Sequence, residues 1–168
     1  MVSPDWARIF LATRKQTVSK AEFNVVAIGN AIVDVIVQTN DDFLLDNKIE
    51  KGVMTLIGAD EAAALYKKVI TALETSGGSA ANTIAGLVSM GGSGAFIGKV
   101  RDDELGKIFR RDIQSLGVRF DTPPATSGAG TARCLVLVTD DADRTLNTYL
   151  GACVGLEVKD VDADLIRA

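Results

Sequence analysis

Histidine is absent from the 168-residue sequence, and cysteine occurs only twice. Without histidine, Ser-His-Asp triads and histidine metal sites are excluded, so a general base would have to be a carboxylate, lysine, tyrosine or cysteine. Cys134 and Cys153 stand in unrelated contexts and form no CxxC pair. We therefore expect two buried free thiols, as in a cytoplasmic protein, and no metal site.

Positive charge is also in deficit, because the net charge is -4 and the isoelectric point is about 4.8. Nonspecific affinity for nucleic acids and anionic membranes comes largely from lysine and arginine. No apolar run approaches the ~20 residues of a membrane helix. We predict a cytoplasmic protein with no nucleic-acid or membrane partner, although a local basic pocket for an anion remains compatible with this charge.

Residues 1–22 lack a convincing structural pattern. The stretch MVSPDWARIFLATRKQTVSK breaks a short apolar patch with Arg8 and places its basic residues after that patch. A secretory signal has the reverse order. We expect an unstructured or upstream extension, with an amphipathic transit segment as the alternative, and assign residues 23–168 to the N-terminal part of one domain.

Short apolar strands alternate with amphipathic helices from Phe23 onward, which predicts an α/β sheet. Strands are expected at 25–28, 32–37, near 53–57, at 95–97, and at 132–138 and 145–150 as a hairpin. Helices are expected from Asp60 to Leu73, after a Ser79 N-cap, from Asp102 or Asp103 to Leu116 with a Gly117 C-terminal cap, and in the final ten residues.

The common phosphate-binding signatures are not met. The sequence has no GxxxxGK[ST], and Gly92, Gly94 and Gly98 miss the GxGxxG spacing by one residue. The pair Gly77-Gly78 is more informative, because two glycines let main-chain amides approach a polar ligand. If Ser79 caps the following helix, Asn82 lies in the first turn and offers a donor and an acceptor. The alternative is a plain turn with a solvated asparagine.

Two charged residues are further candidates. Asp34 is the one carboxylate within an aliphatic strand, where burial is costly unless the charge is paired. It either faces solvent or accepts hydrogen bonds from hydroxyl groups of a ligand. Arg144 follows the acidic hairpin turn and either forms a weak surface ion pair or binds phosphate.

Four stretches in order, GNAIVDVIV, GGSAANTIAGLVSMGG, FIGKVRDDELG and GTARCLVLVTDDADRTLNTYLGA, resemble the PfkB (ribokinase-like) family of small-molecule kinases. KGVMTLI and RTLNTYLGA look most like the adenosine kinase-like branch of that family. The resemblance implies a three-layer α/β/α sheet with a small β lid, here truncated, and use of ATP and Mg²⁺ by the complete enzyme. It also implies a small-molecule acceptor, either a nucleoside or a sugar.

By matching motif positions, the resemblance implies that Asp34, Gly77, Gly78 and Asn82 bind the acceptor, with Asn30 at the edge, while Arg144 approaches the phosphates. The family's catalytic DTxGAGD-like stretch, which supplies the base and an anion hole, has no counterpart here. SGAGTA at 127–132 lacks the aspartate that would follow its glycines. We therefore expect no catalytic residue in this chain, little activity from it alone, and self-association of the truncated sheet. Phosphorylation of adenosine to AMP is the first hypothesis, and a sugar kinase or a non-catalytic binding module are the alternatives.

Overall fold

The computed structural model describes residues 21–70 and 73–168, so the predictions for residues 1–20 lie outside the described part. Strands and helices alternate as predicted, which confirms the α/β class. The strands are β1 (Val25–Ile28), β2 (Ile32–Gln38), β3 (Met54–Leu56), β4 (Leu73–Gly77), β5 (Gly94–Ile97), β6 (Ala132–Val138) and β7 (Arg144–Tyr149). The α-helices are α2 (Asp41–Asp46), α3 (Ala59–Lys68), α4 (Ser79–Ser89), α5 (Glu104–Ser115) and α6 (Ala163–Arg167), with 3-10 turns η1 (Gly151–Gly155) and η2 (Val158–Asp160).

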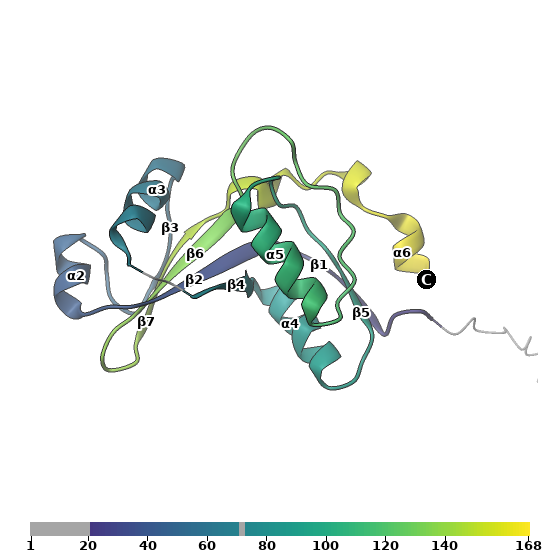
Figure 1. The fold of residues 1–168 in the computed structure, drawn as a ribbon, viewed down its shortest axis with the longest axis horizontal. Coiled ribbons are helices and arrows are strands. Elements are labelled where there is room, and N and C mark those ends of the chain that lie inside the picture. Colours follow the sequence, from purple (N-terminus) through teal and green to yellow (C-terminus); the bar gives the residue numbers. More distant parts are fainter. Residues whose placement is uncertain (1–20, 71–72) are drawn as a thin grey trace, which may run out of the picture.

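The smaller sheet pairs β1 and β5 in parallel. Its helices lie on both faces, with α4 on one side and the C-terminal segment on the other (Figure 1). On the second side, Leu165 of α6 packs with Ala95 and Ile97 of β5. This helix–sheet–helix arrangement gives a parallel sheet the apolar cover that it requires on both faces.

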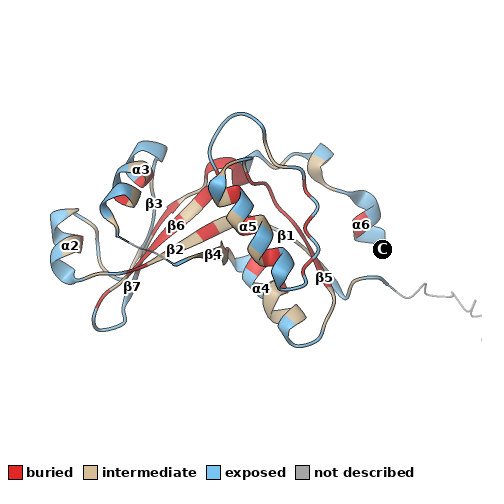
Figure 2. Cartoon of the chain, viewed as in Figure 1, coloured by how far each residue is buried: buried red, intermediate tan, exposed pale blue. Residues whose placement is uncertain are grey.

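The larger sheet has five strands in the order β3-β7-β6-β2-β4. The pairs β2–β6 and β3–β7 are parallel, and β6–β7 and β2–β4 are antiparallel. Successive side chains of β2 point to opposite faces, as in any strand. Val33, Val35 and Val37 are buried in the core, whereas Ile32 and Asp34 lie on the opposite face and are half-buried (Figure 2).

Helix α5 packs buried side chains into the core, and its N-cap residue is hydrogen-bonded to the residue before β6. Asp103 caps the helix by accepting a 2.9 Å hydrogen bond from the Gly106 N–H, which confirms the predicted start. The same carboxylate accepts hydrogen bonds from the main-chain N–H and the hydroxyl of Thr131, at 2.9 and 2.6 Å. Inside the core, Phe109 packs against Phe96 and Phe120 with ring centroids 5.8 and 5.3 Å apart.

Three predicted helix boundaries are wrong. The helix expected from Asp60 to Leu73 has Gly58 as its N-cap and ends at Lys68, and Leu73 instead begins β4. Pairing of β4 with β2 overrides the local helical periodicity of this segment. The N-cap of α4 is Gly78 rather than Ser79, which is the first helical residue. Gly78 has a φ of +95°, a value that favours glycine and lets the chain turn from strand to helix.

The main chain is closely packed at the end of the larger sheet, where the chain passes to and from the smaller one. A Cβ atom on Gly78 would lie 2.6 Å from the carbonyl oxygen of Asn30, which joins β1 to β2. A Cβ atom on Gly151, after β7, would lie 2.2 Å from the carbonyl oxygen of Gly130, just before β6. A side chain at either position would clash with the main chain of the neighbouring segment.

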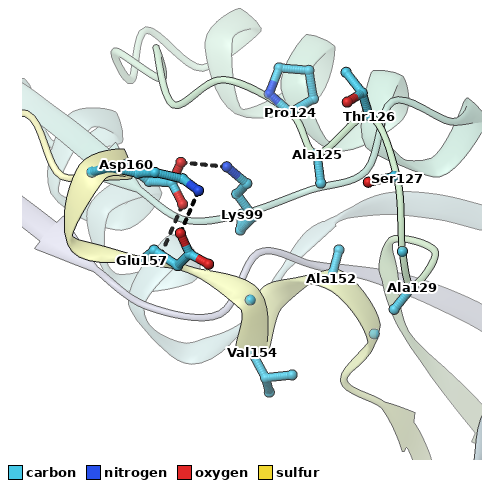
Figure 3. Close-up of a pocket in the computed structure, with 14 residues that line it drawn as sticks. Lys99, Pro124, Ala125, Thr126, Ser127, Ala129, Ala152, Val154, Glu157 and Asp160 are labelled. Atoms are coloured by element: carbon cyan, nitrogen blue, oxygen red, sulfur yellow. Dashed lines mark hydrogen bonds and ion pairs between the residues drawn. The ribbon is translucent and has the colours of Figure 1, made fainter.

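A buried ion pair fixes the C-terminal segment to the end of β5. The Lys99 ammonium lies 2.5 Å from the Asp160 carboxylate, and their side chains are 10% and 6% exposed. Asp160 also accepts a hydrogen bond from the Glu157 N–H at 3.0 Å. The pair lies at one end of a cavity of about 510 Å³, with Pro124 and Ser127 on the opposite wall (Figure 3). The hydrogen bond from Lys99 lowers the pKa of Asp160 below its ordinary value.

Among the described residues, no helix combines the length and the hydropathy needed to cross a lipid bilayer.

The ion pair gives a first prediction. Lys99→Met leaves a buried carboxylate without its partner and should lower the free energy of unfolding by about 3 kcal/mol. Because the folded pKa of Asp160 is depressed, its stabilisation is present above the ordinary aspartate pKa and is lost as pH falls through the depressed value. The difference between wild type and variant, measured by chemical denaturation, should therefore shrink in acid.

The matched control is Lys107→Met, which breaks an exposed pair with Glu104. It should leave the unfolding midpoint almost unchanged, because solvent already screens such a pair. Equal effects of the two substitutions at neutral pH would show that the Lys99 pair does not anchor the segment.

Candidate functional site

The candidate site centres on Asp34 of β2 and Gly77 of β4, on the face of the larger sheet opposite the core. In the antiparallel register Asp34 pairs with Thr75 and Ile32 pairs with Gly77, so Asp34 and Gly77 are diagonal neighbours. The Asp34 carboxylate leans over the Gly77 backbone. A Cβ atom on Gly77 would lie 2.2 and 2.6 Å from the two carboxylate oxygens. Only glycine at position 77 leaves room for the carboxylate in this position.

The Asp34 carboxylate is partly desolvated and receives no hydrogen bond from the described residues. The side chain is half-buried, and burial raises the pKa of the carboxyl group above its ordinary value. No hydrogen bond from the described residues offsets that burial. A desolvated carboxylate gains stability when donors approach it, so this group is suited to accept hydrogen bonds from a bound molecule.

The N-terminus of α4 lies beside this carboxylate, because Gly77 and the N-cap Gly78 are consecutive. No described side chain caps the helix, and its first internal bond runs from the Asn82 N–H to the Gly78 carbonyl oxygen at 2.8 Å. The preceding N–H groups therefore have no partner inside the helix. Asn30 contacts Gly78 through its main chain, and the side chains of Asn30 and Asn82 are exposed.

The structure thus places five of the predicted site residues around one junction, where β2, β4 and α4 meet. These residues are Asn30, Asp34, Gly77, Gly78 and Asn82.

Arg144 shares the face of Asp34 but lies farther along the sheet. Asp34 pairs with Cys134, which pairs with Thr148, and Arg144 precedes Thr148 by four positions on β7. Four residues of strand span ~13 Å. The Arg144 side chain is exposed, and the ion pairs found within the described chain do not include it. The structure brings it to the same face without contact with Asp34.

Sequence reasoning missed Cys134 and Thr148, which stand in one row with Asp34 across β2, β6 and β7. The Thr148 hydroxyl donates a hydrogen bond to the Cys134 sulfur at 3.3 Å. Burial and the nearby Asp34 charge raise the pKa of the Cys134 thiol. Cys134 and Cys153 are both buried and free, as predicted. Strand alternation placed Cys134 on one face of its strand, but only the strand pairing brings it to Asp34.

An apolar row lies next to the row that contains Asp34, on the same face of the sheet. Ile36 and Leu146 are half-buried, Val136 between them is buried, and Met54 at the end of the row is 60% exposed. Leu56, which pairs with Thr148, extends this surface and is 59% exposed. We call this surface the apolar strip; it consists of Ile36, Val136, Leu146, Met54 and Leu56.

The predicted use of Mg²⁺ has no counterpart in these residues. Within residues 21–70 and 73–168, no three acidic or cysteine side chains gather in a way that could hold a metal ion. The face carries a hydrogen-bond acceptor, helix N–H groups and a distant guanidinium, which together can bind a polyhydroxylated molecule.

Comparison with known proteins gives the family. Residues 24–166 match the pfkB family carbohydrate kinase profile. The adenosine kinase from Sinorhizobium meliloti is 51% identical, with a TM-score of 0.80, over 87% of this chain and 45% of that one. A probable sugar kinase protein from Rhizobium etli is 49% identical, also with a TM-score of 0.80, over 87% and 44% of the two chains.

A probable chloroplastic fructokinase-6 from Arabidopsis thaliana is 30% identical over 85% of this chain and 32% of its own length. The chain thus spans less than half the length of these relatives. The predicted fold is confirmed, with the smaller parallel sheet between helices and Asp34 in the larger sheet. The predicted family is confirmed as well: the chain belongs to the pfkB family of carbohydrate kinases.

Proposed function

We propose that this chain supplies the acceptor-binding part of an ATP-dependent kinase that phosphorylates a primary hydroxyl of a nucleoside, most specifically adenosine to AMP. The observation that carries the proposal is the half-buried Asp34 carboxylate, which has no described donor and lies against Gly77. Membership of the pfkB family makes phosphoryl transfer the reaction class. The acceptor is bound by this chain, and ATP is the second substrate.

In this proposal, Asp34 accepts hydrogen bonds from the sugar hydroxyls of the acceptor. The N–H groups at the start of α4 donate to the same hydroxyl oxygens, since no described side chain occupies them. Gly77 and Gly78 keep the main chain free of side chains at this point, so the sugar ring can approach closely. Together, the Asp34 carboxylate and the N–H groups of α4 fix the orientation of the sugar and hence the position of its primary hydroxyl.

The apolar strip favours a nucleoside over a free sugar. It begins one row from Asp34 with the half-buried Ile36, and its exposed part, Met54 and Leu56 on the edge strand β3, is an aliphatic surface that a nucleobase can cover. A free hexose has no comparable apolar part. The similarity to an adenosine kinase at 51% identity agrees with this choice.

The transfer itself forms a bond between the acceptor oxygen and the γ-phosphorus and breaks the bond between that phosphorus and the β,γ-bridging oxygen. ADP leaves with the bonding electrons, and the hydroxyl proton passes to a general base. We place that base outside this chain, because the 168 residues contain no DTxGAGD-like stretch. Arg144, on the same face as Asp34, would pair with the phosphates when the larger sheet closes over them. This chain alone should therefore bind acceptor but catalyse little transfer.

A sugar kinase is the second candidate. The probable sugar kinase from Rhizobium etli is almost as similar as the adenosine kinase, and the fructokinase from Arabidopsis also matches. The third candidate is a binding module without catalysis, because no DTxGAGD-like stretch occurs in the 168 residues.

Calorimetric titration of this chain with adenosine and with fructose tests the proposal. Adenosine should bind more tightly than fructose, and Asp34→Asn should weaken adenosine binding by about tenfold to a hundredfold through loss of charge-assisted hydrogen bonds. The variant should be at least as stable as wild type in the absence of ligand, because the charge it removes is penalised by burial.

Asp140→Asn is the control, since this exposed residue lies at the hairpin turn outside the site. It should bind adenosine like wild type. Tighter binding of fructose would favour the sugar kinase, and unchanged adenosine affinity in Asp34→Asn would contradict the assignment of the site.

Gly77→Ala provides a second prediction from the same geometry. The added methyl group would lie within 2.2 Å of an Asp34 oxygen and force the carboxylate away. Acceptor affinity should fall by at least tenfold while the fold persists, because the far end of a side chain can move. Calorimetry and the far-ultraviolet circular dichroism spectrum measure the two effects.

Gly86→Ala in α4 is the matched control, because its Cβ would meet no atom within 4 Å. It should leave acceptor binding unchanged and raise the free energy of unfolding by about 0.5–1 kcal/mol through helix propensity. Equal affinities of the two alanine variants would argue against a role for the Gly77 contact.

A further inference from the structure

Two side-chain nitrogens within residues 21–70 and 73–168 are buried without a hydrogen-bond partner. They are Nε of Arg133 in β6 and Nδ2 of Asn147 in β7. Both nitrogens are donors only. An unpaired buried donor costs the free energy of its desolvation, and in native proteins such a group is usually met by a partner, an ordered water or an ion. These two N–H groups therefore point to an acceptor that the described residues do not provide.

The two nitrogens belong to neighbouring side chains on one face of the larger sheet. In the antiparallel pair β6–β7, Arg133 pairs with Tyr149, and Asn147 precedes Tyr149 by two positions on the same face. Arg133 also pairs with Val33, which places this face on the side opposite Asp34. Diagonal neighbours of this kind lie ~7–8 Å apart, within reach of a long side chain. One small acceptor between Arg133 and Asn147 can therefore meet both N–H groups.

The Arg133 guanidinium is held by aromatic rings and not by a carboxylate. Its central carbon lies 5.2 Å from the centroid of the Tyr66 ring and 5.9 Å from that of the Tyr149 ring. The face of an aromatic ring attracts a cation over such distances. The ion pairs found among the described residues do not include Arg133. Because this positive charge is not balanced by an ion pair, the missing acceptor is best supplied by an anion.

One carboxylate on the same face, Glu74 of β4, is bonded elsewhere. Strand β2 separates β4 from β6, so Glu74 and Arg133 lie two strand spacings, ~10 Å, apart in the sheet. The Glu74 carboxylate accepts a hydrogen bond from the Tyr66 hydroxyl. This bond raises the pKa of Tyr66, so the hydroxyl remains a donor to Glu74 at neutral pH.

Burial limits the size of the acceptor. Asn147 is 4% exposed, and both unpaired nitrogens are closed to solvent. A polyatomic anion such as sulfate or phosphate needs more room than two enclosed N–H groups leave. A monatomic anion is closer in size to a water molecule, and its charge strengthens the hydrogen bonds that it accepts.

We propose that Arg133 and Asn147 form a binding site for a monatomic anion, chloride, on the face of the larger sheet opposite Asp34. The anion accepts hydrogen bonds from Nε–H of Arg133 and Nδ2–H of Asn147, while the rings of Tyr66 and Tyr149 keep the guanidinium in place. The site links β6 to β7 and stabilises the folded chain. It shares no residue with the candidate site around Asp34, so it stands independently of the proposed function.

Urea denaturation of the full 168-residue chain tests the proposal. The measurement is made in sodium chloride and in sodium gluconate at equal ionic strength, because gluconate is too large for the site. A ligand that binds only the folded chain stabilises it, so the unfolding equilibrium constant in about 0.3 M chloride should be about fivefold smaller than in gluconate. Bromide should act like chloride.

The informative variants are Asn147→Asp and Arg133→Met. Aspartate replaces a donor with a carboxylate that can accept from Arg133, so it takes the place of the anion. Methionine removes the charge and the Nε–H. Both variants should unfold with the same equilibrium constant in chloride and in gluconate. The matched control is Arg111→Met, which removes an exposed arginine of α5 and should keep the chloride dependence of the wild type.

Nuclear magnetic resonance of the wild-type chain gives a measurement that does not depend on the folding of a variant. The Nε–H signal of Arg133 and the side-chain amide signal of Asn147 should shift together and saturably as chloride replaces gluconate. Signals that do not respond to chloride would mean that water or no ligand meets these donors, and would overturn the proposal. A chloride dependence of unfolding that Asn147→Asp and Arg133→Met retain in full would overturn it as well.

Discussion

The position of one carboxylate constrains the whole candidate site. Asp34 belongs to a strand whose neighbouring side chains, Val33 and Val35, are fully buried, so its own position cannot move independently of the core. The charge is half-buried without a described donor, and it is tolerated because Gly77 leaves space beside it. The core therefore holds an under-bonded carboxylate in place before any ligand arrives, which lowers the entropic cost of binding.

The same junction connects the two sheets. Gly78 lies against the Asn30 carbonyl oxygen, and Gly151 lies against the Gly130 carbonyl oxygen, both at the end of the larger sheet where Ile32 pairs with Ala132. Both glycines have positive φ values, so the strands turn sharply where they leave the larger sheet. Asp34 and the start of α4 are held close to each other, because Gly77 of β4 pairs with Ile32 of β2 and is followed directly by the N-cap Gly78.

Local sequence patterns predicted most of the helices and strands, whereas strand pairing determined the features that these patterns did not predict. Asp34 could be predicted because a single carboxylate interrupts an aliphatic strand. Its neighbours Cys134 and Thr148 could not, since they lie about a hundred residues away and only the β2–β6–β7 register brings them together. The helix expected to reach Leu73 ends earlier because that residue pairs with Ile36 of β2, a contact that periodicity does not encode. Family resemblance supplied the grouping of Asp34 with the glycine pair, which spacing alone left open.

The direct test of this account is the titration of the Asp34 carboxyl carbon by nuclear magnetic resonance, with and without adenosine. The pKa should lie above the ordinary aspartate value in the free chain, because burial penalises the charge. The pKa should be lower in the presence of adenosine, because the hydroxyl donors stabilise the ionised form. An ordinary pKa in the free chain, or a pKa that saturating adenosine leaves unchanged, would contradict the account.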